Sequence, residues 1–280
     1  MAFFETSDGV RLYYQDWGDG PAVVFTHAWA LSSDQWTYQM PALLDAGLRC
    51  VAYDRRGHGR SDRPGRGYEF DRLADDLATL IDQLDLQHVT LMGHSLGTRE
   101  IVRYLTRHGL ARVDKLVFVS PTTPFLLRTS DNPDGWDRAL VEASSAALRA
   151  DVPRWCSESN RVGPYFGTTS RDVQGLVEWT TRMIVDTPLH VLLQTAGNQI
   201  VTDMRPELPR ITLPTLIVHG DADASAPIDL TGRKTARLMS NAQLVEYAGA
   251  GHGLYASENQ RLNADVLEFI HSDAQVRQAA

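Results

Sequence analysis

The chain is poor in cysteine and has no long apolar run. Its 280 residues include two cysteines, Cys50 and Cys156, whose positions fit no metal-ligand or redox spacing, so we expect two free thiols and no metal site. No apolar stretch approaches the ~18 residues that a membrane-spanning helix needs. The first residues lack the basic segment and apolar core of a signal peptide. These absences predict a cytoplasmic protein without a membrane partner.

An excess of positive charge is also missing. The chain has 27 lysines and arginines against 35 aspartates and glutamates, a formal net charge of −8, which argues against nucleic acid or an anionic membrane as a partner. We find no internal repeat and no low-complexity linker. A hydrophobic content of 43% is enough to fill one large core with room for an inserted subdomain. The composition is therefore that of a soluble enzyme, and a homo-oligomer is compatible with it.

Apolar runs alternate with helical patterns over much of the chain. Residues 2–17 indicate an antiparallel hairpin at a sheet edge, and the alternation that follows predicts βαβ units and a mostly parallel sheet. Between Pro121 and Pro209 the alternation stops, and three helical segments replace it, at 136–150, 171–185 and 188–196. We expect residues 1–120 and 210–280 to form the core, and residues 121–209 to form an inserted helical cap that closes a site from water.

Five residues, Gly93-His94-Ser95-Leu96-Gly97, stand between an apolar strand at 89–92 and a helical stripe. In that context a Gly-x-Ser-x-Gly pentad indicates a sharp turn that exposes a nucleophilic serine. The turn forces Ser95 towards positive φ, and side chains at Gly93 or Gly97 would collide with each other or with neighbouring backbone. The pentad predicts Ser95 as a nucleophile.

A nucleophilic serine requires a histidine base and a carboxylate that orients it. Both follow later in the chain, each just past a predicted strand: Asp221 or Asp223 after the strand at 215–219, and His252 in a glycine-rich loop after the strand at 243–247. Taken singly, a serine between glycines is usually a turn, and an acidic pair after a strand is usually a cap or a solvated loop. Because all three occur in the right order at strand ends, we favour an active site. Spacing leaves the two aspartates open as alternatives.

An acyl-transfer site also needs two donors for the developing oxyanion. The backbone N–H of Leu96, which follows the nucleophile, is one candidate, and the backbone N–H of Trp29, in the loop after the strand at 22–26, is the other. The segment 121–209 is rich in large apolar side chains that could line a pocket. For the substrate pocket we predict Trp29, Phe125, Trp179 and Met183.

Together with the run YDRRGHGRSD at 53–62, these motifs resemble the α/β-hydrolase family. Within it the chain resembles the branch of aryl esterases and cofactor-free haloperoxidases, also called perhydrolases, over nearly its whole length. The resemblance implies an α/β-hydrolase fold: a mostly parallel eight-stranded sheet flanked by helices, with an inserted helical cap. It also selects Asp223 as the acid, because HGDADASAP at 219–227 matches the branch pattern His-Gly-x-x-Asp-x-x-x-Pro.

The resemblance implies a carboxylesterase-type serine hydrolase that cleaves small carboxylic esters or lactones with water, through an acyl-enzyme on Ser95 and without a cofactor. Two positions depart from the family pattern. The usual His-Gly is His27-Ala28 here, and Ala30 replaces a proline found in members that make peracids readily. With alanine at that position we expect hydrolysis to dominate over perhydrolysis.

Several alternatives remain open on the same motifs. They are peracid formation from a carboxylic acid and hydrogen peroxide, acyl transfer to other alcohols, carbon–carbon bond hydrolysis, and a ligand receptor that turns over once. Dehalogenases and epoxide hydrolases of this fold are excluded because they carry aspartate where Ser95 stands.

Overall fold

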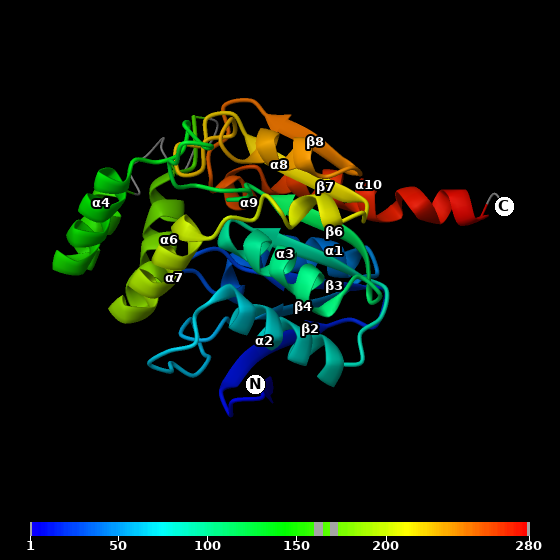
Figure 1. Cartoon of the computed structure of the whole chain (residues 1–280). Coiled ribbons are helices and arrows are strands. Elements are labelled where there is room, and N and C mark those ends of the chain that lie inside the picture. Colours follow the sequence, from blue (N-terminus) through cyan, green and yellow to red (C-terminus); the bar gives the residue numbers. More distant parts are fainter. Residues whose placement is uncertain (1, 160–164, 169–172, 279–280) are drawn as a thin grey trace.

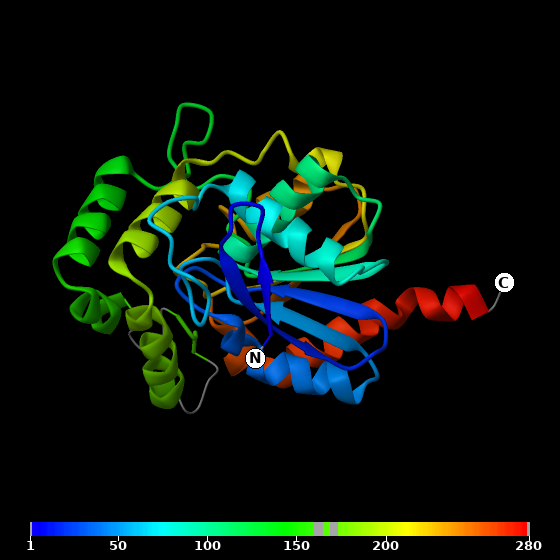
Figure 2. The same cartoon turned by 90° about the horizontal axis from the view of Figure 1, so that it is seen from below.

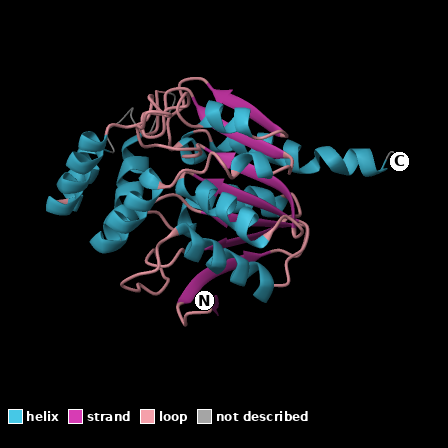
Figure 3. Ribbon diagram, in the orientation of Figure 1, coloured by secondary structure: helices cyan, strands magenta, loops and turns pink. Residues whose placement is uncertain are grey.

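A sheet of eight strands forms the centre of the molecule (Figure 3), in a computed structural model that describes residues 2–159, 165–168 and 173–278. The strands are β1 (Ala2–Glu5), β2 (Arg11–Trp17), β3 (Ala22–Thr26), β4 (Arg49–Tyr53), β5 (Val89–His94), β6 (Val113–Val119), β7 (Thr215–Gly220) and β8 (Ala242–Tyr247). Their order is β1-β2-β4-β3-β5-β6-β7-β8. Strand β2 is antiparallel to both neighbours, and all other neighbours are parallel. The predicted mostly parallel sheet and its edge hairpin are confirmed.

Helices cover both faces of the sheet. Strands β3, β5 and β7 are buried along their whole length, which explains why they are continuous apolar runs. Helices α2 and α3 lie on one face, and α1 and α10 lie on the other (Figure 2). The helices outside the insertion are α1 (Gln39–Asp45), α2 (Phe70–Gln83), α3 (Leu96–His108), α8 (Gly232–Leu238), α9 (Leu254–Ser257) and α10 (Asn259–Gln278).

The segment between β3 and β4 contains two helical elements. A 3-10 helix, η1 (Ser33–Tyr38), precedes α1, and Trp36 interrupts regular helical geometry with φ −85° and ψ 16°. Ser32 caps η1 by accepting a hydrogen bond from the backbone N–H of Asp34. A second 3-10 helix, η2 (Leu208–Arg210), lies before β7.

Among the described residues, four α-helices lie between β6 and β7, and those labelled in Figure 1 stand beside the sheet instead of on its faces. They are α4 (Arg138–Ala150), α5 (Val152–Ser159), α6 (Val173–Asp186) and α7 (Leu189–Val201). Helices α4, α6 and α7 correspond to the predicted segments, although residues 171–172 of the predicted 171–185 helix lie outside the described residues. Helix α5 was not predicted, because eight residues are too few to show a clear helical period.

A buried arginine on α3 holds both ends of this insertion. The Arg99 guanidinium donates hydrogen bonds to the carbonyl and the hydroxyl of Thr122, which follows β6, and to the carbonyl of Thr202, 2.9 Å away, which follows α7. The outgoing and returning chain segments are therefore fixed to the same helix.

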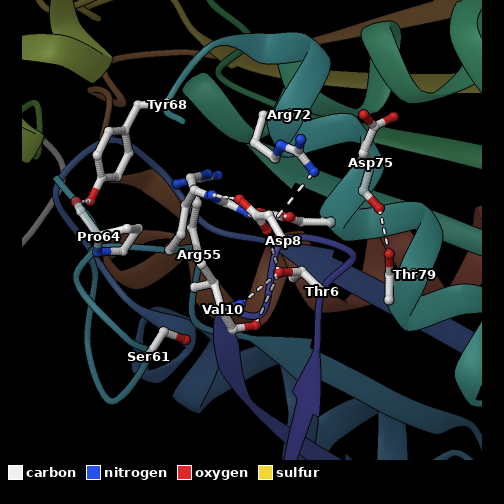
Figure 4. Close-up of polar contacts among 12 residues, drawn as sticks. Thr6, Asp8, Val10, Arg55, Ser61, Pro64, Tyr68, Arg72, Asp75 and Thr79 are labelled. Carbon is white, nitrogen blue, oxygen red and sulfur yellow. Dashed lines mark hydrogen bonds and ion pairs between the residues drawn. The ribbon is translucent and has the colours of Figure 1, made fainter. Parts of the chain in front are cut away.

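The edge hairpin is tied to the core through Asp8, in the turn between β1 and β2. Figure 4 shows Asp8 with Thr6 on one side and Arg72 on the other. The Thr6 hydroxyl donates to Asp8 at 2.6 Å, and two nitrogens of Arg56 donate to the same carboxylate at 3.0 Å. Arg56 also pairs with buried Asp76 on α2. The hydrogen bonds from Arg56 hold the pKa of Asp8 well below its ordinary value.

Both cysteines are free and buried, as predicted. Burial raises the pKa of Cys50 to about 12 and the pKa of Cys156 to about 11, so neither thiol is activated. No helix within the described ranges has both the length and the apolar character required to cross a bilayer.

Candidate active site

Ser95 occupies a strained turn between β5 and α3. Its backbone has φ 56° and ψ −118°, a region that costs a non-glycine residue about 1–3 kcal/mol and is common at functional sites. Its N–H donates to the carbonyl of Val119 at 3.0 Å. A Cβ on Gly97 would overlap the carbonyl oxygen of Thr26, and one on Gly93 would lie 2.8 Å from the Thr26 hydroxyl. Backbone packing against Thr26 therefore excludes a side chain at Gly97, whereas at Gly93 the side chains of Thr26 and Ile101 are the nearest neighbours.

Ser95, His252 and Asp223 form one hydrogen-bonded chain. His252 Nε2 lies 2.9 Å from Ser95 Oγ, and His252 Nδ1 lies 2.7 Å from Asp223 Oδ2. The three side chains come from the ends of β5, β7 and β8, and all are buried. Asp221, the alternative acid, instead accepts the N–H of Gly249 at 2.6 Å. The geometry therefore brings Asp223 to the imidazole and leaves Asp221 supporting the backbone of the histidine loop.

The two oxygens of Asp223 have different partners. Oδ1 accepts the backbone N–H groups of Ser225, at 2.9 Å, and Ala226, at 2.7 Å. Oδ2 faces His252 and also His219 Nε2, at 3.1 Å. Burial alone would raise the pKa of Asp223, but the attraction of His252 and the hydrogen bonds from both imidazoles outweigh it and lower the pKa. The carboxylate is therefore ionised and fixed in orientation.

The loop after β3 is fixed on both sides of Ala28. The Ala28 carbonyl faces His27 Nδ1 at 2.7 Å, and the Ala28 N–H donates to Gln35 Oε1 at 2.9 Å. In a trans peptide the N–H points opposite to the preceding carbonyl, so the Trp29 N–H is directed away from His27. Within the described part of the chain, neither this N–H nor that of Leu96 has an acceptor. Both donors are therefore available to a ligand.

Arg55 supports the same loop from behind. Its Nη2 donates to the His27 carbonyl at 2.8 Å, and its Nε donates to Glu100 at 2.8 Å, with both charged side chains buried. Neither residue was expected to have a role at the site. The only signal was that Arg55 lies in the YDRRGHG run, whereas Glu100 looked like an ordinary helical residue.

A cavity of about 440 Å³ opens at Ser95 and His252. Large apolar side chains supply most of its wall. They are Trp29, Leu31, Trp136, Leu140, Val141, Leu148, Trp155, Tyr165, Ile184 and Ile200. Among the described residues, His252 and the phenol of Tyr165 are the only titratable side chains that line it. No three His, Cys, Asp or Glu side chains in the described ranges cluster as a metal site would require.

Trp29, one of the residues predicted to line the substrate pocket, borders this cavity. Its indole Nε1 donates to the Leu192 carbonyl at 3.1 Å, and its ring meets Trp155 edge-on with centroids 5.4 Å apart. Phe125 was placed in the pocket as well, but it is absent from the described cavity wall. Its buried ring lies under the guanidinium of Arg205, 5.0 Å from the ring centroid, and so packs at the base of the insertion.

Two further pocket predictions, Trp179 and Met183, also lie away from the described cavity wall. Both are on α6, four residues apart, on a face that packs towards η1. The Trp179 ring lies 6.2 Å from the Tyr38 ring, and Met183 Sδ lies 3.7 Å from the hydroxyl of Ser32. Helix α6 reaches the cavity through Ile184 instead. The prediction identified the helix but not the side that faces the cavity.

Comparisons with known proteins show what the chain is similar to. Residues 21–258 match the family described as the alpha/beta hydrolase fold. A non-heme chloroperoxidase of Kitasatospora aureofaciens is 36% identical over 280 residues, which cover 97% of this chain and 100% of that protein. A bifunctional esterase/perhydrolase of Acinetobacter calcoaceticus is 35% identical over 279 residues, with the same coverage. The structure of an esterase from Exiguobacterium antarcticum superposes with a TM-score of 0.91 at 29% identity, covering 96% of this chain and 98% of that one.

Proposed function

The chain belongs to the α/β-hydrolase family, in its branch of esterases and cofactor-free haloperoxidases, and from that premise we propose that it is a serine hydrolase of carboxylic esters or lactones. The observation that carries the proposal is the hydrogen-bonded chain from Ser95 through His252 to Asp223, which ends at an apolar cavity.

The mechanism follows from this geometry. Asp223 accepts a hydrogen bond from the Nδ1–H of His252, which keeps the proton on Nδ1 and leaves the Nε2 lone pair facing Ser95 Oγ. His252 takes the Ser95 proton as the hydroxyl oxygen attacks the carbonyl carbon, and then gives that proton to the leaving alcohol. Water, activated by the same imidazole, releases the acid from the acyl-enzyme.

We assign the oxyanion donors to the backbone N–H groups of Trp29 and Leu96. Both N–H groups lack an acceptor within the described structure, and the Trp29 donor is directed by the anchored Ala28 carbonyl. Each such donor typically contributes about 3 kcal/mol of transition-state stabilisation.

The cavity indicates the kind of substrate. Its volume of about 440 Å³ is within the range for small organic ligands. Because its described wall is apolar and lacks a lysine or arginine, we infer that the substrate is an uncharged ester or lactone with a bulky apolar group. Residues 121–209 act as a cap in this proposal, since they provide most of the wall and exclude water from the acyl-enzyme.

Perhydrolysis is the second candidate, because the names of two relatives are chloroperoxidase and esterase/perhydrolase. Two observations favour hydrolysis. Ala30 has φ 61°, which a proline with φ fixed near −65° cannot adopt, so this loop conformation is closed to the proline that the resemblance associates with ready peracid formation. The cavity also lacks a cationic side chain among its described residues to hold a carboxylate substrate.

The test is hydrolysis of p-nitrophenyl acetate and of bulkier aryl esters and lactones by the wild type and by Ser95→Ala. We expect sustained turnover that disappears in the variant. Turnover that persists in Ser95→Ala contradicts the serine mechanism, and a single burst without turnover supports a receptor. Bromination of monochlorodimedone that requires acetate and peroxide, at a rate above ester hydrolysis, favours the perhydrolase.

A further inference from the structure

A second hydrogen-bonded chain runs behind Ser95 and His252 and uses residues outside the proposed triad. Gln35, on η1, accepts the Ala28 N–H through Oε1 at 2.9 Å and places its Nε2 3.0 Å from His94 Nδ1. His94 Nε2 in turn lies 2.9 Å from the backbone carbonyl of His252. The Gln35 and His94 side chains are both completely buried, so water cannot replace these partners.

The direction of every hydrogen bond in this chain follows from its first member. The Ala28 N–H can only donate, so it fixes Oε1 of Gln35 at that end and turns the Nε2 amide towards His94. Nδ1 of His94 must then accept, which leaves the ring proton on Nε2 to donate to the His252 carbonyl. Burial lowers the pKa of His94 well below its ordinary value, which agrees with a neutral ring of this single tautomer.

Packing holds the His94 ring in place. Its centroid lies 4.8 Å from that of His252 and 4.9 Å from that of Tyr255. Since both of its nitrogens have partners, His94 cannot take the proton of Ser95 and is not a second base.

Resting on the proposed function, we propose that Gln35 and His94 are positioning residues that hold the oxyanion loop, the nucleophile turn and the histidine loop in register. Each end of the chain bonds the backbone next to a reacting group: Ala28 precedes the Trp29 donor, and the His252 carbonyl belongs to the base itself. His94 directly precedes Ser95 in the chain. Loss of these hydrogen bonds shifts the three backbone segments relative to one another, and misplacement of a reacting group by about 1 Å can lower the rate ~10²-fold.

Gln35→Met tests this role, because methionine has a similar length but cannot replace either hydrogen bond. We expect kcat for p-nitrophenyl acetate to fall about 10- to 100-fold with KM changed less than about twofold, since Gln35 itself is not part of the cavity wall. Gln39→Met is the matched control. Gln39 is equally buried but donates to the Tyr255 carbonyl at 2.8 Å, outside the chain. The kcat of the Gln39→Met variant should stay within about threefold of the wild-type kcat.

His94→Phe is the second variant, since it keeps an aromatic ring between His252 and Tyr255 and removes both polar links. It decides the question alone if Gln35→Met does not fold. Titration of Ser95 with a fluorophosphonate gives the concentration of competent sites, so that kcat is compared per folded enzyme.

An unchanged kcat in both variants overturns the proposal, as does an equal fall in Gln39→Met. Failure of the proposed function gives a different result: either the wild type does not hydrolyse esters, or Ser95→Ala still hydrolyses them. The positioning role is then measured by the rate at which the fluorophosphonate labels Ser95 instead of by kcat. Equal labelling rates in the wild type and the variants overturn it.

Discussion

Replacing Asp223 with asparagine should trap His252 in the wrong tautomer. Oδ1 of Asp223 accepts two backbone N–H groups, from Ser225 and Ala226, so the amide nitrogen of asparagine is forced to the Oδ2 position. There it donates a hydrogen to His252 Nδ1. The ring proton then moves to Nε2 and points at Ser95 Oγ, and the imidazole can no longer accept the serine proton.

The size of the effect follows from the same contacts. A productive tautomer requires the asparagine amide to flip, which places its NH₂ against two backbone donors, that of buried Ala226 and that of half-buried Ser225, at about 1–3 kcal/mol each. The middle of that range, about 4 kcal/mol in total, corresponds to ~10³-fold in rate. Loss of the carboxylate charge that stabilises the protonated ring adds to this. We expect kcat to fall by ~10³ to 10⁴.

The assay is steady-state hydrolysis of an aryl ester, with Asp221→Asn as the matched control. Asp221 accepts one backbone N–H from Gly249 and does not touch the ring, so its variant should keep more than about a tenth of kcat. An Asp223→Asn enzyme that keeps a tenth of wild-type kcat would refute the reasoning, and a larger loss in Asp221→Asn would assign the acid to the other aspartate.

Three further outcomes are expected. Ala30→Pro should lower the thermal unfolding midpoint and kcat together, because φ 61° is closed to proline; Ala30→Gly should keep both, and a stable, active proline variant would show that the loop is adaptable. Gly97→Ala should lower the free energy of unfolding in urea by about 1–3 kcal/mol and abolish most of kcat, because the new Cβ overlaps Thr26. Wild-type values would contradict the close contact between Gly97 and Thr26. Asp8→Asn should lower the free energy of unfolding by about 1 kcal/mol at pH 7, since Arg56 lowers the pKa of Asp8 below 3.8 in the folded protein. The difference in unfolding free energy between wild type and variant should shrink as the pH falls below 3.8. A difference that grows over that range would contradict the pairing of Asp8 with Arg56.

The part of the site that lies at strand ends could be predicted from the sequence. Ser95, Asp223 and His252 each follow an apolar run that is a strand in the structure, and parallel strands bring their carboxyl ends to one edge of the sheet. The glycines around Ser95 made the turn predictable, because a side chain at either position would collide with its neighbours. The catalytic roles of the three residues stay predictions, which the Ser95 and Asp223 variants test.

The cap side of the cavity could not be predicted in the same detail. An amphipathic pattern places Trp179, Met183 and Ile184 on α6, but which face meets the cavity depends on how the helix packs against η1. The supporting contacts of Gln35 could not be predicted either. Its buried amide joins Ala28 to His94, which lies 59 positions after Gln35, and such a contact leaves no local pattern. Such contacts are decided by tertiary packing, not by local propensity.

Arg99 has a consequence for how this enzyme can change. One guanidinium on α3 donates to the carbonyls of Thr122 and Thr202, so both ends of the helical segment between them are held at fixed points of the core. The segment has further contacts with the core, among them the Trp29 indole with the Leu192 carbonyl and the Thr187 hydroxyl with the Ala30 carbonyl. We expect a segment taken from a relative to change the cavity wall and leave the turn at Ser95 in place only if it preserves these contacts as well as those of Arg99.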